Sequence, residues 1–515
     1  MDFEPYQVTP YSDFSQKDVL ERYQNALEHV RGKLGREYPL VIGGETVPAK
    51  GFIDSVNPCN TEQLVGRTAK AGRKEVEKTM NVAWTAYASW SQLTMAERAR
   101  TLVKLAAVMR RRTFELAAWE TFEASKNYAE AEADVAEAID FCEYYARQAL
   151  LLDGPLATHD YPGEENTSFL VPIGVGVVIP PWNFLLAILV GTAVGPVVVG
   201  NTVIVKPSPD TPIIAHIFME CVAEAGFPAG VINLITGADA DIGDLLVDHP
   251  RTRFINFTGS LATGLRIHER AAKLQPGQKW LKKVYAELGG KDALIVDETA
   301  DLELAAAAAV ASAFSFQGQK CSALSRLIIV DEVYDDLLEQ VVARTRLLSV
   351  GPAEENRDVG AVINQKAVDK IMGYIDNGKT EARLVLGGGR GDEAGFFIEP
   401  TIFADVPQSA SVACEEIFGP VLSVMRARDF AHALEIANAT VYGLTGGVFS
   451  RNRSRLEHAR RELQVGNLYL NRKITGALVG VQPFGGFNLS GSNAKAGGPD
   501  YLRLFMEMKT VTERF

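Results

Sequence analysis

The chain has 515 residues, of which 47% are hydrophobic and 23% charged, and its formal net charge is −12. This composition is typical of a globular protein with two or three domains, and the acidic excess argues against nucleic-acid binding, which needs a concentrated basic face. The five cysteines are scattered and form no C-x-x-C pair, which argues against a disulfide framework or a zinc site and favours a reducing compartment.

The first 150 residues are predicted to be mostly helical. The amino terminus carries no secretion or transit signal, so we expect a cytoplasmic protein. A helix is expected from about Asp13, because apolar residues recur at helical spacing. A hairpin at 40–45 and an extended piece at 53–63 follow, and residues 75–151 again have a helical pattern. The helical apolar positions are Val19, Leu20, Tyr23, Leu27 and Val30.

From residue 174 onward, short apolar runs alternate with helical segments, which predicts a parallel, doubly wound α/β sheet. The expected strands are 174–179, 202–205, 231–234, 253–257 and 293–296, and the expected helices are 185–195, 211–225, 241–247 and 263–274. A second α/β block is expected over 302–460, with strands at 327–330 and 421–425. Residues 171–205 carry no charge, but prolines and asparagines divide them into pieces too short to span a bilayer.

Three polar features follow expected strands, where ligands of parallel sheets bind. Asn183 lies just past a strand and is suited to donate to an oxyanion, although a turn-forming asparagine is an equal alternative. Lys206 ends the next strand, where it could reach ribose hydroxyls or simply be a surface lysine. Gly259 and Ser260 open a helix whose free N–H groups could hold a pyrophosphate, or the segment is a purely structural turn.

Cys321 is the candidate nucleophile. It follows a glycine-containing turn between an alanine-rich helix and a strand, and Glu287 lies 34 residues upstream as a candidate base. A nucleophile at such a junction, with a carboxylate to serve it, is a common enzymatic arrangement. The alternative is a buried core cysteine, since free cysteine is among the most buried residue types.

Seven short motifs in one order resemble the aldehyde dehydrogenase superfamily over nearly the whole chain. Two further stretches, 471–480 and 495–501, are similar to its 1-pyrroline-5-carboxylate dehydrogenase branch. The motifs are Trp182-Asn183-Phe184, Lys206-Pro207-Ser208, Phe257-Thr258-Gly259-Ser260, Glu287-Leu288-Gly289-Gly290-Lys291, Gly318-Gln319-Lys320-Cys321, Glu415-Glu416-Ile417-Phe418-Gly419-Pro420 and Pro483-Phe484-Gly485-Gly486.

The resemblance implies a Rossmann-type cofactor domain, an α/β catalytic domain and a small oligomerisation arm. The expected boundaries are 1–155 with 171–290 for the N-terminal helices and cofactor domain, 291–480 for the catalytic domain, and 156–170 with 490–515 for the arm and C-terminal strand. Family members associate through such an arm, and strands at 168–172 and 508–513 are the candidates. We therefore expect a homodimer or a larger dimer-based assembly, acting as a stand-alone enzyme without nucleic-acid or membrane partners.

The resemblance also implies a mechanism. The Cys321 thiolate would attack an aldehyde, the Asn183 amide and the Cys321 N–H would hold the oxyanion, and Glu287 would activate water to hydrolyse the thioester. Glu287 suits this role if desolvation raises its pKa. Cofactor contacts are expected from Lys206, Ser260, Gly259, Trp182, Glu416 and Phe418.

The branch implies L-glutamate 5-semialdehyde as the substrate, with L-glutamate as the product. Its α-carboxylate would meet the backbone N–H groups of Gly476 and Ala477 and the Ser322 hydroxyl. Its carbon chain would lie between Phe184 and Phe484, unless these rings are plain core packing, and Glu132 would bind its ammonium. The alternatives are a dehydrogenase for another semialdehyde or aliphatic aldehyde, and a catalytically silent relative.

The sequence departs from the family pattern near the expected cofactor site. Pro209 stands three residues after Lys206, where NAD-preferring members often carry a glutamate that binds both ribose hydroxyls. Without that carboxylate, a 2′-phosphate is not repelled. NAD is the expected cofactor, with NADP as the alternative. Ile474 also stands where relatives of the branch often carry a small or polar residue, which concerns the loop expected to bind the substrate.

Overall fold

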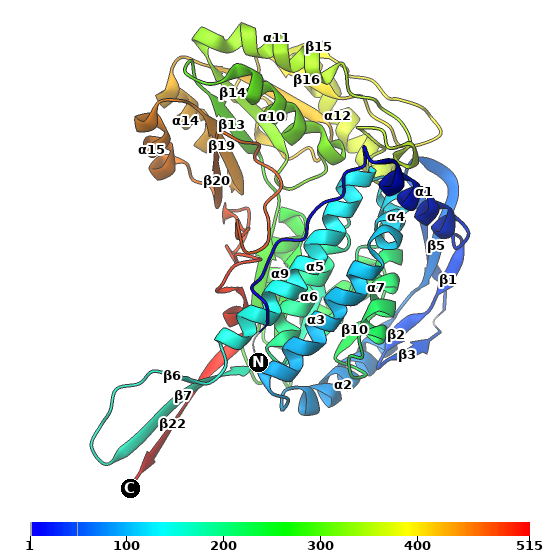
Figure 1. Cartoon of the computed structure of the whole chain (residues 1–515), viewed down its shortest axis with the longest axis vertical. Coiled ribbons are helices and arrows are strands. Elements are labelled where there is room, and N and C mark those ends of the chain that lie inside the picture. Colours follow the sequence, from blue (N-terminus) through cyan, green and yellow to red (C-terminus); the bar gives the residue numbers. More distant parts are fainter. Residues whose placement is uncertain (1–2, 49) are drawn as a thin grey trace.

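The computed structural model describes residues 3–48 and 50–515, and two seven-stranded sheets dominate it (Figure 1). The first sheet has the strand order β12-β11-β8-β9-β10-β2-β3. Its first five strands are parallel, and β2 and β3 extend it antiparallel. The strands are β2 (Leu40–Ile42), β3 (Glu45–Val47), β8 (Val175–Ile179), β9 (Thr202–Val205), β10 (Ile232–Leu234), β11 (Phe254–Thr258) and β12 (Lys283–Glu287).

The predicted doubly wound sheet is confirmed, because four of the expected strands are β8 to β11 within a residue or two. Every residue of β9 is buried, as the uncharged Val/Ile run predicts for a sheet covered on both faces. The expected strand at 293–296 belongs to the second sheet instead. β12 was not predicted, since it lies at the edge and four of its five residues are only half-buried.

The topology of this sheet determines where a ligand binds. The chain passes from β8 to β9 and β10 on one side and returns to β11 on the other side of β8. The carboxyl ends of β8 and β11 therefore flank a topological switch point, where open α/β sheets bind their ligands. Asn183, Lys206, Ser260 and Glu287 all lie at or just beyond this edge of the sheet.

Helices cover both faces of the sheet, and residues 75–151 form most of α2 to α5, as predicted. α3 begins with a capping box in which Thr94 accepts from the Glu97 N–H, and α5 begins where Asn127 accepts from the Glu130 N–H. α5 packs on α3, α4 and α6. The helices are α1 (Lys17–Arg31), α2 (Arg73–Trp90), α3 (Met95–Arg111), α4 (Thr113–Ala124), α5 (Tyr128–Leu151), α6 (Ala187–Val198), α7 (Ile213–Glu224), α8 (Asp244–Asp248) and α9 (Leu261–Ala271).

The second sheet has the order β15-β16-β17-β14-β13-β19-β20, parallel except for the edge strand β15. Its strands are β13 (Asp292–Val296), β14 (Leu324–Val330), β15 (Arg383–Leu386), β16 (Thr401–Ala404), β17 (Val421–Ala427), β19 (Thr445–Phe449) and β20 (Asn467–Leu470). Its helices are α10 (Leu302–Phe314), α11 (Tyr334–Thr345), α12 (Gln365–Glu381), α13 (Ser411–Cys414), α14 (Phe430–Asn438) and α15 (Arg453–Glu462).

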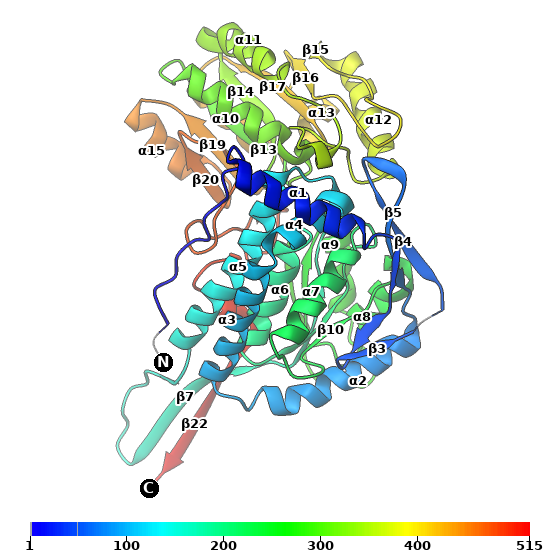
Figure 2. The same cartoon turned by 45° about the vertical axis from the view of Figure 1, so that its right-hand side comes forward.

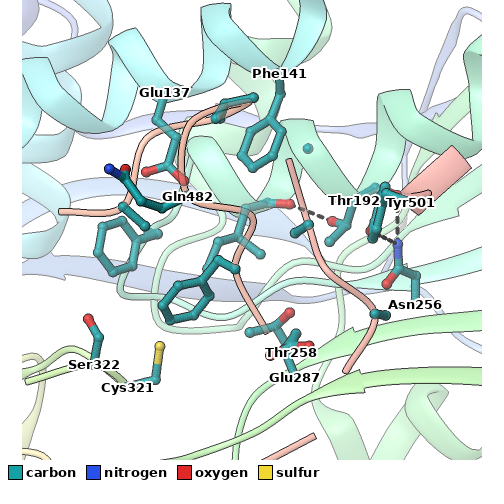
Figure 3. A pocket seen from close by; sticks show the side chains of 18 of the residues that line it. Glu137, Phe141, Thr192, Asn256, Thr258, Glu287, Cys321, Ser322, Gln482 and Tyr501 are labelled. Atoms are coloured by element: carbon teal, nitrogen blue, oxygen red, sulfur yellow. Dashed lines mark hydrogen bonds between the residues drawn. The ribbon is translucent and has the colours of Figure 1, made fainter. Parts of the chain in front are cut away.

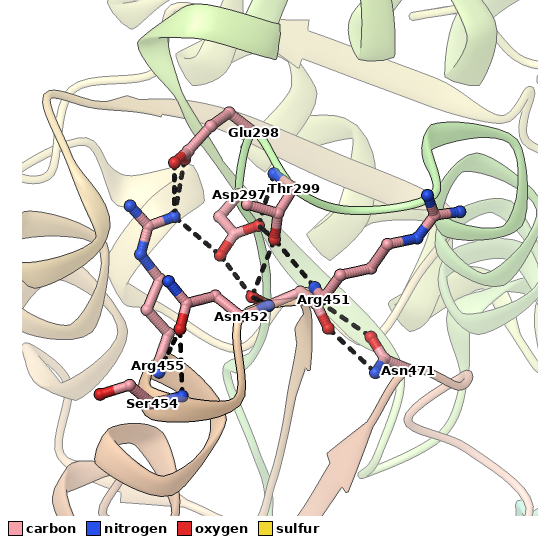
Figure 4. A network of polar contacts seen from close by, with 9 residues as sticks. Asp297, Glu298, Thr299, Arg451, Asn452, Ser454, Arg455 and Asn471 are labelled. Carbon is pink, nitrogen blue, oxygen red and sulfur yellow. Dashed lines mark hydrogen bonds and ion pairs between the residues drawn. The ribbon is translucent and has the colours of Figure 1, made fainter.

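A polar network closes the carboxyl end of this second sheet (Figure 4). The fully buried Asp297, which follows β13, accepts from the Ser450 hydroxyl at 2.5 Å and from Arg455 at 2.9 Å. The Asn471 side chain accepts from the Ser450 N–H at 2.9 Å. Side chains thus occupy the end where a parallel sheet usually binds a ligand, and the amino end is left to face the first sheet.

A three-stranded arm extends from the body (Figures 1 and 2). β7 (Glu164–Pro172) pairs antiparallel with β22 (Met506–Arg514) from Met506–Pro172 to Arg514–Glu164, and β6 (Pro155–Leu156) adds a short third strand. The strands expected at 168–172 and 508–513 lie within this pair. Of the predicted arm region 490–515, β22 pairs with β7 in the arm. Tyr501, which precedes β22, packs on the body instead and stacks on Tyr145 of α5 with ring centroids 5.3 Å apart.

Two smaller ribbons complete the described part of the chain. β1 (Arg36–Tyr38), β4 (Phe52–Asn57) and β5 (Asn60–Ala69) form one sheet, and β18 (Tyr442–Gly443) pairs with β21 (Phe487–Asn488). The predicted extended piece at 53–63 falls on β4 and β5. None of the helices in residues 3–48 and 50–515 combines the length and apolar character needed to cross a bilayer.

Candidate active site

The two large sheets meet at a cavity that contains both predicted reacting groups (Figure 3). Glu287 is the last residue of β12, and Cys321 lies three residues before β14. The carboxyl end of one sheet therefore faces the amino end of the other. The cavity measures about 960 Å³ when the solvent at its mouth is included. Residues 34 positions apart in the sequence thus share one space in which a bond to sulfur can form and be hydrolysed.

A strained turn presents Cys321. Phe316, Gln317 and Gly318 have φ values of 50°, 56° and 66°, and each of the two non-glycine residues costs about 1–3 kcal/mol in this conformation. Surrounding contacts enforce the turn. A Cβ on Gly318 would lie 2.3 Å from the Gly419 carbonyl oxygen, and the Gln319 side chain accepts from the Ile363 N–H at 2.9 Å. Cys321 is partly exposed, unlike the core cysteine of the alternative interpretation.

The surroundings of Cys321 favour its protonated form. Burial raises the pKa of the Cys321 thiol, and the negative charges of Asp292, Glu416 and Glu287 raise it further. Because the thiolate is the nucleophilic form, the thiol must lose its proton before or during attack. A cationic ligand bound beside the sulfur would assist that loss electrostatically.

Glu287 is held as an unpartnered carboxyl group. Both of its oxygens are buried, and neither has a well-aligned hydrogen-bond partner among the described residues. Burial raises the pKa of Glu287 well above its ordinary value, and the positive charge of Lys495 and the nearby Gly486 backbone N–H oppose this. Buried, unsatisfied polar groups are rare in folded proteins and often mark a functional position. Glu287 is therefore suited to exchange a proton with a molecule in the cavity.

Asn183 lies against the nucleophile turn. Its side-chain Nδ2 donates to the Gln319 carbonyl oxygen at 3.0 Å, two residues before Cys321, and the residue is 3% exposed. It does not line the cavity itself. An amide nitrogen carries two N–H groups, so this contact orients the side chain and leaves a second donor.

The residues predicted to contact a cofactor lie together at the switch point. Ser260 caps α9, where its hydroxyl accepts from the Thr263 N–H at 3.3 Å, and the Gly259 N–H donates to the Glu287 carbonyl oxygen at 3.0 Å. The rings of Trp182 and Phe418 meet edge to face with centroids 5.4 Å apart. A helix amino terminus of this kind favours phosphate groups.

Two further cofactor candidates are charged and largely buried. Lys206 is 1% exposed, and its ammonium pairs with Asp239, a carboxylate that sequence analysis did not identify. Glu416 accepts from the Gly290 N–H at 3.0 Å, and a Cβ on Gly289 would lie 2.2 Å from the Glu416 carboxylate. Glycine is therefore needed there for Glu416 to approach. The charged side chains of Lys206 and Glu416 are suited to bind ribose hydroxyls, and the amino terminus of α9 is suited to bind phosphate. Together these features fit a dinucleotide.

Five predicted substrate residues line the cavity, namely Ser322, Gly476, Ala477, Phe184 and Phe484. The Thr475 and Gly476 carbonyl oxygens accept from the Arg472 guanidinium at 3.1 and 3.3 Å. In a trans peptide the C=O and N–H point in opposite directions, so the Gly476 and Ala477 N–H groups point away from Arg472. These two donors are oriented for an anion such as a carboxylate.

Glu132 is not part of the cavity, and this prediction requires correction. Its carboxylate is buried and accepts from the Ser12 N–H at 2.9 Å and from the Ser12 hydroxyl. Glu137 lines the cavity instead, across from Cys321 and Ser322 (Figure 3). Five residues on a helix correspond to a rotation of about 140°, so the two carboxylates cannot share a face. The i, i+4 pairing of Glu137 with Phe141, which also lines the cavity, is the signal that could have identified it.

Burial raises the pKa of Glu137 to about 8, and the negative charge of Asp134 contributes. Burial disfavours the ionised form of this carboxyl group. A cationic ligand beside it would stabilise the carboxylate and would itself be bound more tightly. The cavity thus has anion-binding donors on one wall and a carboxyl group on another. This pairing matches the two charged groups of an α-amino acid.

The comparisons with known proteins agree with this geometry. The model of the aldehyde dehydrogenase family matches residues 46–511. The chain is 56% identical to the 1-pyrroline-5-carboxylate dehydrogenase of Geobacillus thermodenitrificans (strain NG80-2) over 513 residues, which cover 99% of this chain and 100% of the relative.

Solved structures give the same result. The crystal structure of 1-pyrroline-5-carboxylate dehydrogenase from Thermus with bound NAD is 56% identical, covers 100% of both chains and superposes with a TM-score of 0.99. Proline utilization A from Bdellovibrio bacteriovorus is 43% identical with a TM-score of 0.97, and the match covers 100% of this chain and 54% of that one.

Proposed function

The chain belongs to the aldehyde dehydrogenase family, and on this premise we propose that it oxidises L-glutamate 5-semialdehyde to L-glutamate with NAD. The substrate equilibrates with 1-pyrroline-5-carboxylate, so the reaction belongs to proline degradation. One observation carries the proposal. The cavity that holds Cys321 and Glu287 also holds the Gly476–Ala477 backbone and Glu137, which suit the carboxylate and the ammonium of an amino acid.

The first chemical step is attack on the aldehyde carbon by the Cys321 sulfur. The thiol gives up its proton to solvent water, the new C–S bond forms, and the carbonyl oxygen becomes the oxyanion of a thiohemiacetal. The second N–H of the Asn183 amide and the Cys321 backbone N–H stabilise that oxyanion. When bound, the nicotinamide supplies the hydride acceptor that makes the step an oxidation. The thiohemiacetal carbon loses its hydrogen as that hydride, the oxyanion becomes a carbonyl again, and the sulfur then carries a thioester.

Hydrolysis of the thioester is the task of Glu287. The carboxylate takes a proton from water while the water oxygen attacks the thioester carbon, and the Cys321 sulfur leaves. A base with a raised pKa accepts this proton more readily than an ordinary carboxylate. No well-aligned hydrogen bond from the described residues occupies either oxygen, which leaves room for water at the carboxyl group.

The substrate would span the cavity between its two recognition groups and the sulfur. Its α-carboxylate would meet Gly476, Ala477 and the Ser322 hydroxyl, and its ammonium would meet Glu137. The Phe184 and Phe484 rings would pack on its carbon chain. Glu137 favours this substrate over succinate semialdehyde, which has no ammonium for the carboxyl group to pair with.

NAD would bind at the switch point of the first sheet. Ser260, Gly259 and Trp182 would hold the pyrophosphate region, Lys206 the adenosine ribose, and Glu416 with Phe418 the nicotinamide end. The Lys206–Asp239 pair favours NAD over NADP, because a 2′-phosphate would lie near the Asp239 carboxylate.

Each part of the fold is assigned one role. Residues 1–155 and 171–290 would bind the cofactor, 291–480 would carry the nucleophile, and the arm would join copies of the chain into a homodimer or a larger dimer-based assembly. β22 supports this last point, because it is an edge strand with Met508 and Val511 exposed. All five cysteines are free, which supports a cytoplasmic location.

The proposal is tested by following NADH absorbance with purified protein, L-glutamate 5-semialdehyde and NAD. We expect turnover that Cys321→Ala abolishes. Cys414→Ala is the matched control, because Cys414 is also partly exposed but lies outside the cavity, and it should retain activity. Turnover in the Cys321→Ala protein would disprove the nucleophile assignment, and a far higher kcat/KM for an aliphatic aldehyde would disprove the substrate.

A further inference from the structure

The segment before α1 runs in extended form along the outside of α5 and reaches the substrate loop (Figures 1 and 2). We call residues 3–14 the strap and residues 476–480 the anchor loop. The strap touches neither Cys321, Glu287 nor Asn183 through any hydrogen bond in the described residues. The chemistry proposed above therefore gives it no role.

The strap is fastened to α5 at three points in antiparallel order. The Glu4 carbonyl oxygen accepts from Arg147 at 2.7 Å. The Thr9 N–H and hydroxyl both donate to Asp140, at 2.9 and 2.6 Å. The Ser12 N–H and hydroxyl both donate to Glu132. Three extended residues span about 10 Å and eight helical residues about 12 Å, so Thr9 and Ser12 match the spacing of their partners.

These fastening points bracket the carboxyl group that faces the cavity. Glu137 lies between Glu132 and Asp140 on the same helix and turns inward. Glu132 and Asp140 are largely buried, at 4% and 3% exposure. The strap supplies hydrogen bonds to both carboxylates, and burying a carboxylate without such bonds is costly. The strap thus stabilises the stretch of α5 that positions Glu137.

Between Glu4 and Thr9, Tyr6 connects the strap to the anchor loop. The Tyr6 hydroxyl donates to the Val479 carbonyl oxygen at 2.9 Å, and Val479 lines the cavity. The next residue, Gly480, has a φ of +74°, and a Cβ there would lie 3.1 Å from the Tyr6 ring and 2.8 Å from Tyr144. The Tyr6 ring also meets Tyr144 of α5 edge to face at 5.3 Å. Tyr6 therefore joins the anchor loop to the helix that carries Glu137.

We propose that the strap is a specificity element, whose positioning residues Tyr6, Thr9 and Ser12 set the spacing between the anchor-loop N–H groups and Glu137. The inference rests on the proposed function, because it assigns those two sites to the carboxylate and the ammonium of one substrate. Loosening the strap changes how an α-amino acid is held. It leaves the sulfur, the oxyanion donors and the hydrolytic carboxyl group in place.

The test compares two substrates. L-glutamate 5-semialdehyde carries both charged groups, whereas propanal carries neither. Tyr6→Phe removes the hydroxyl that bonds to Val479 and interacts with Asp140, and it should raise the KM for the semialdehyde about fivefold, with kcat little changed. The triple variant Tyr6→Phe, Thr9→Val, Ser12→Ala should raise it more than tenfold. The kcat/KM for propanal should stay within twofold in both variants.

A matched control lies on the chain just beyond the strap. The Ser15 hydroxyl bonds only to Asp13 among the described residues, so Ser15→Ala should behave as the wild type. Thermal unfolding of each variant reports whether the fold has changed. Equal losses on both substrates, or an unchanged KM for the semialdehyde in the triple variant, would overturn the proposal.

A binding measurement separates this inference from the proposed function. L-glutamate should inhibit propanal oxidation competitively, and its inhibition constant should rise in the triple variant by the same factor as the KM. If the wild type oxidises propanal but not the semialdehyde, the proposed function is wrong. Inhibition by L-glutamate then still decides whether the strap governs amino-acid binding, since an inhibition constant that is unchanged in the triple variant would overturn it.

Discussion

Lys495 and Glu287 both contact Gly485. Lys495 donates to the Gly466 and Gly485 carbonyl oxygens at 2.6 and 2.7 Å and to Asn467 at 3.0 Å. A Cβ on Gly485 would lie 2.9 Å from Glu287 Oε1. Lys495 therefore ties down the loop that walls in Glu287, and its charge lowers a pKa that burial raises.

We predict that Lys495→Met moves the acid limb of the kcat–pH profile to higher pH by about one unit. Glu287 must be ionised to take a proton from water, and losing the cation raises its pKa further. The other titratable groups facing Glu287, Cys321 and Tyr501, supply no positive charge. Lys495→Arg keeps the charge and should retain a limb close to that of the wild type. An unchanged limb in Lys495→Met would contradict the prediction.

Glu137→Gln should raise the KM for the semialdehyde about 10- to 100-fold, because a hydrogen bond to a charged group contributes about 1.5–3 kcal/mol. In the wild type, the burial-raised pKa of about 8 means that the carboxylate forms as the pH rises through 8, so this KM should fall over that range. Steady-state kinetics from pH 6.5 to 9 measure both effects. A comparable change with propanal would show that Glu137 acts on something other than the ammonium.

Labelling of Cys321 by iodoacetamide should be slow at pH 7 in the protein without ligands and should rise about tenfold per pH unit up to pH 9. Burial and three carboxyl groups raise the pKa of this thiol, and only the thiolate reacts. Mass spectrometry of the Cys321 peptide measures the rate, with unfolded protein as the reference. Rapid labelling at pH 7 would mean that the thiolate is already stabilised without a cofactor.

Gly290→Ala should inactivate the enzyme and destabilise it by about 1–3 kcal/mol. An added Cβ would lie 2.4 Å from the Cys321 carbonyl oxygen and 2.6 Å from the Asp292 carboxyl group, so the nucleophile turn must shift. Gly373→Ala is the matched control, since it lies inside α12 with nothing within 4 Å of its Cβ. It should stabilise the protein by about 0.5–1 kcal/mol. Thermal unfolding and NADH assays on both variants decide the point.

The local elements were predictable where burial on both faces leaves a clear pattern. Residues 202–205 are β9 residue for residue, because a strand covered on both sides must be apolar throughout. The edge strand β12 lacks that pattern, so Glu287 was recognised by its motif and not as the end of a strand. The Asp239 carboxylate beside Lys206 was missed, since a contact across 33 residues leaves no periodic signal.

The sequence by itself determined the fold class and the family, and it predicted Cys321, Glu287 and the anchor-loop backbone as site residues, because short motifs and hydrophobic periodicity are local properties. Only the tertiary structure decided that Glu137 and not Glu132 faces the cavity, that Lys495 and Glu287 meet at Gly485, and that the strap reaches Val479. These relationships depend on how a helix is rotated against its neighbours and on which distant segments it meets, and long-range packing sets both.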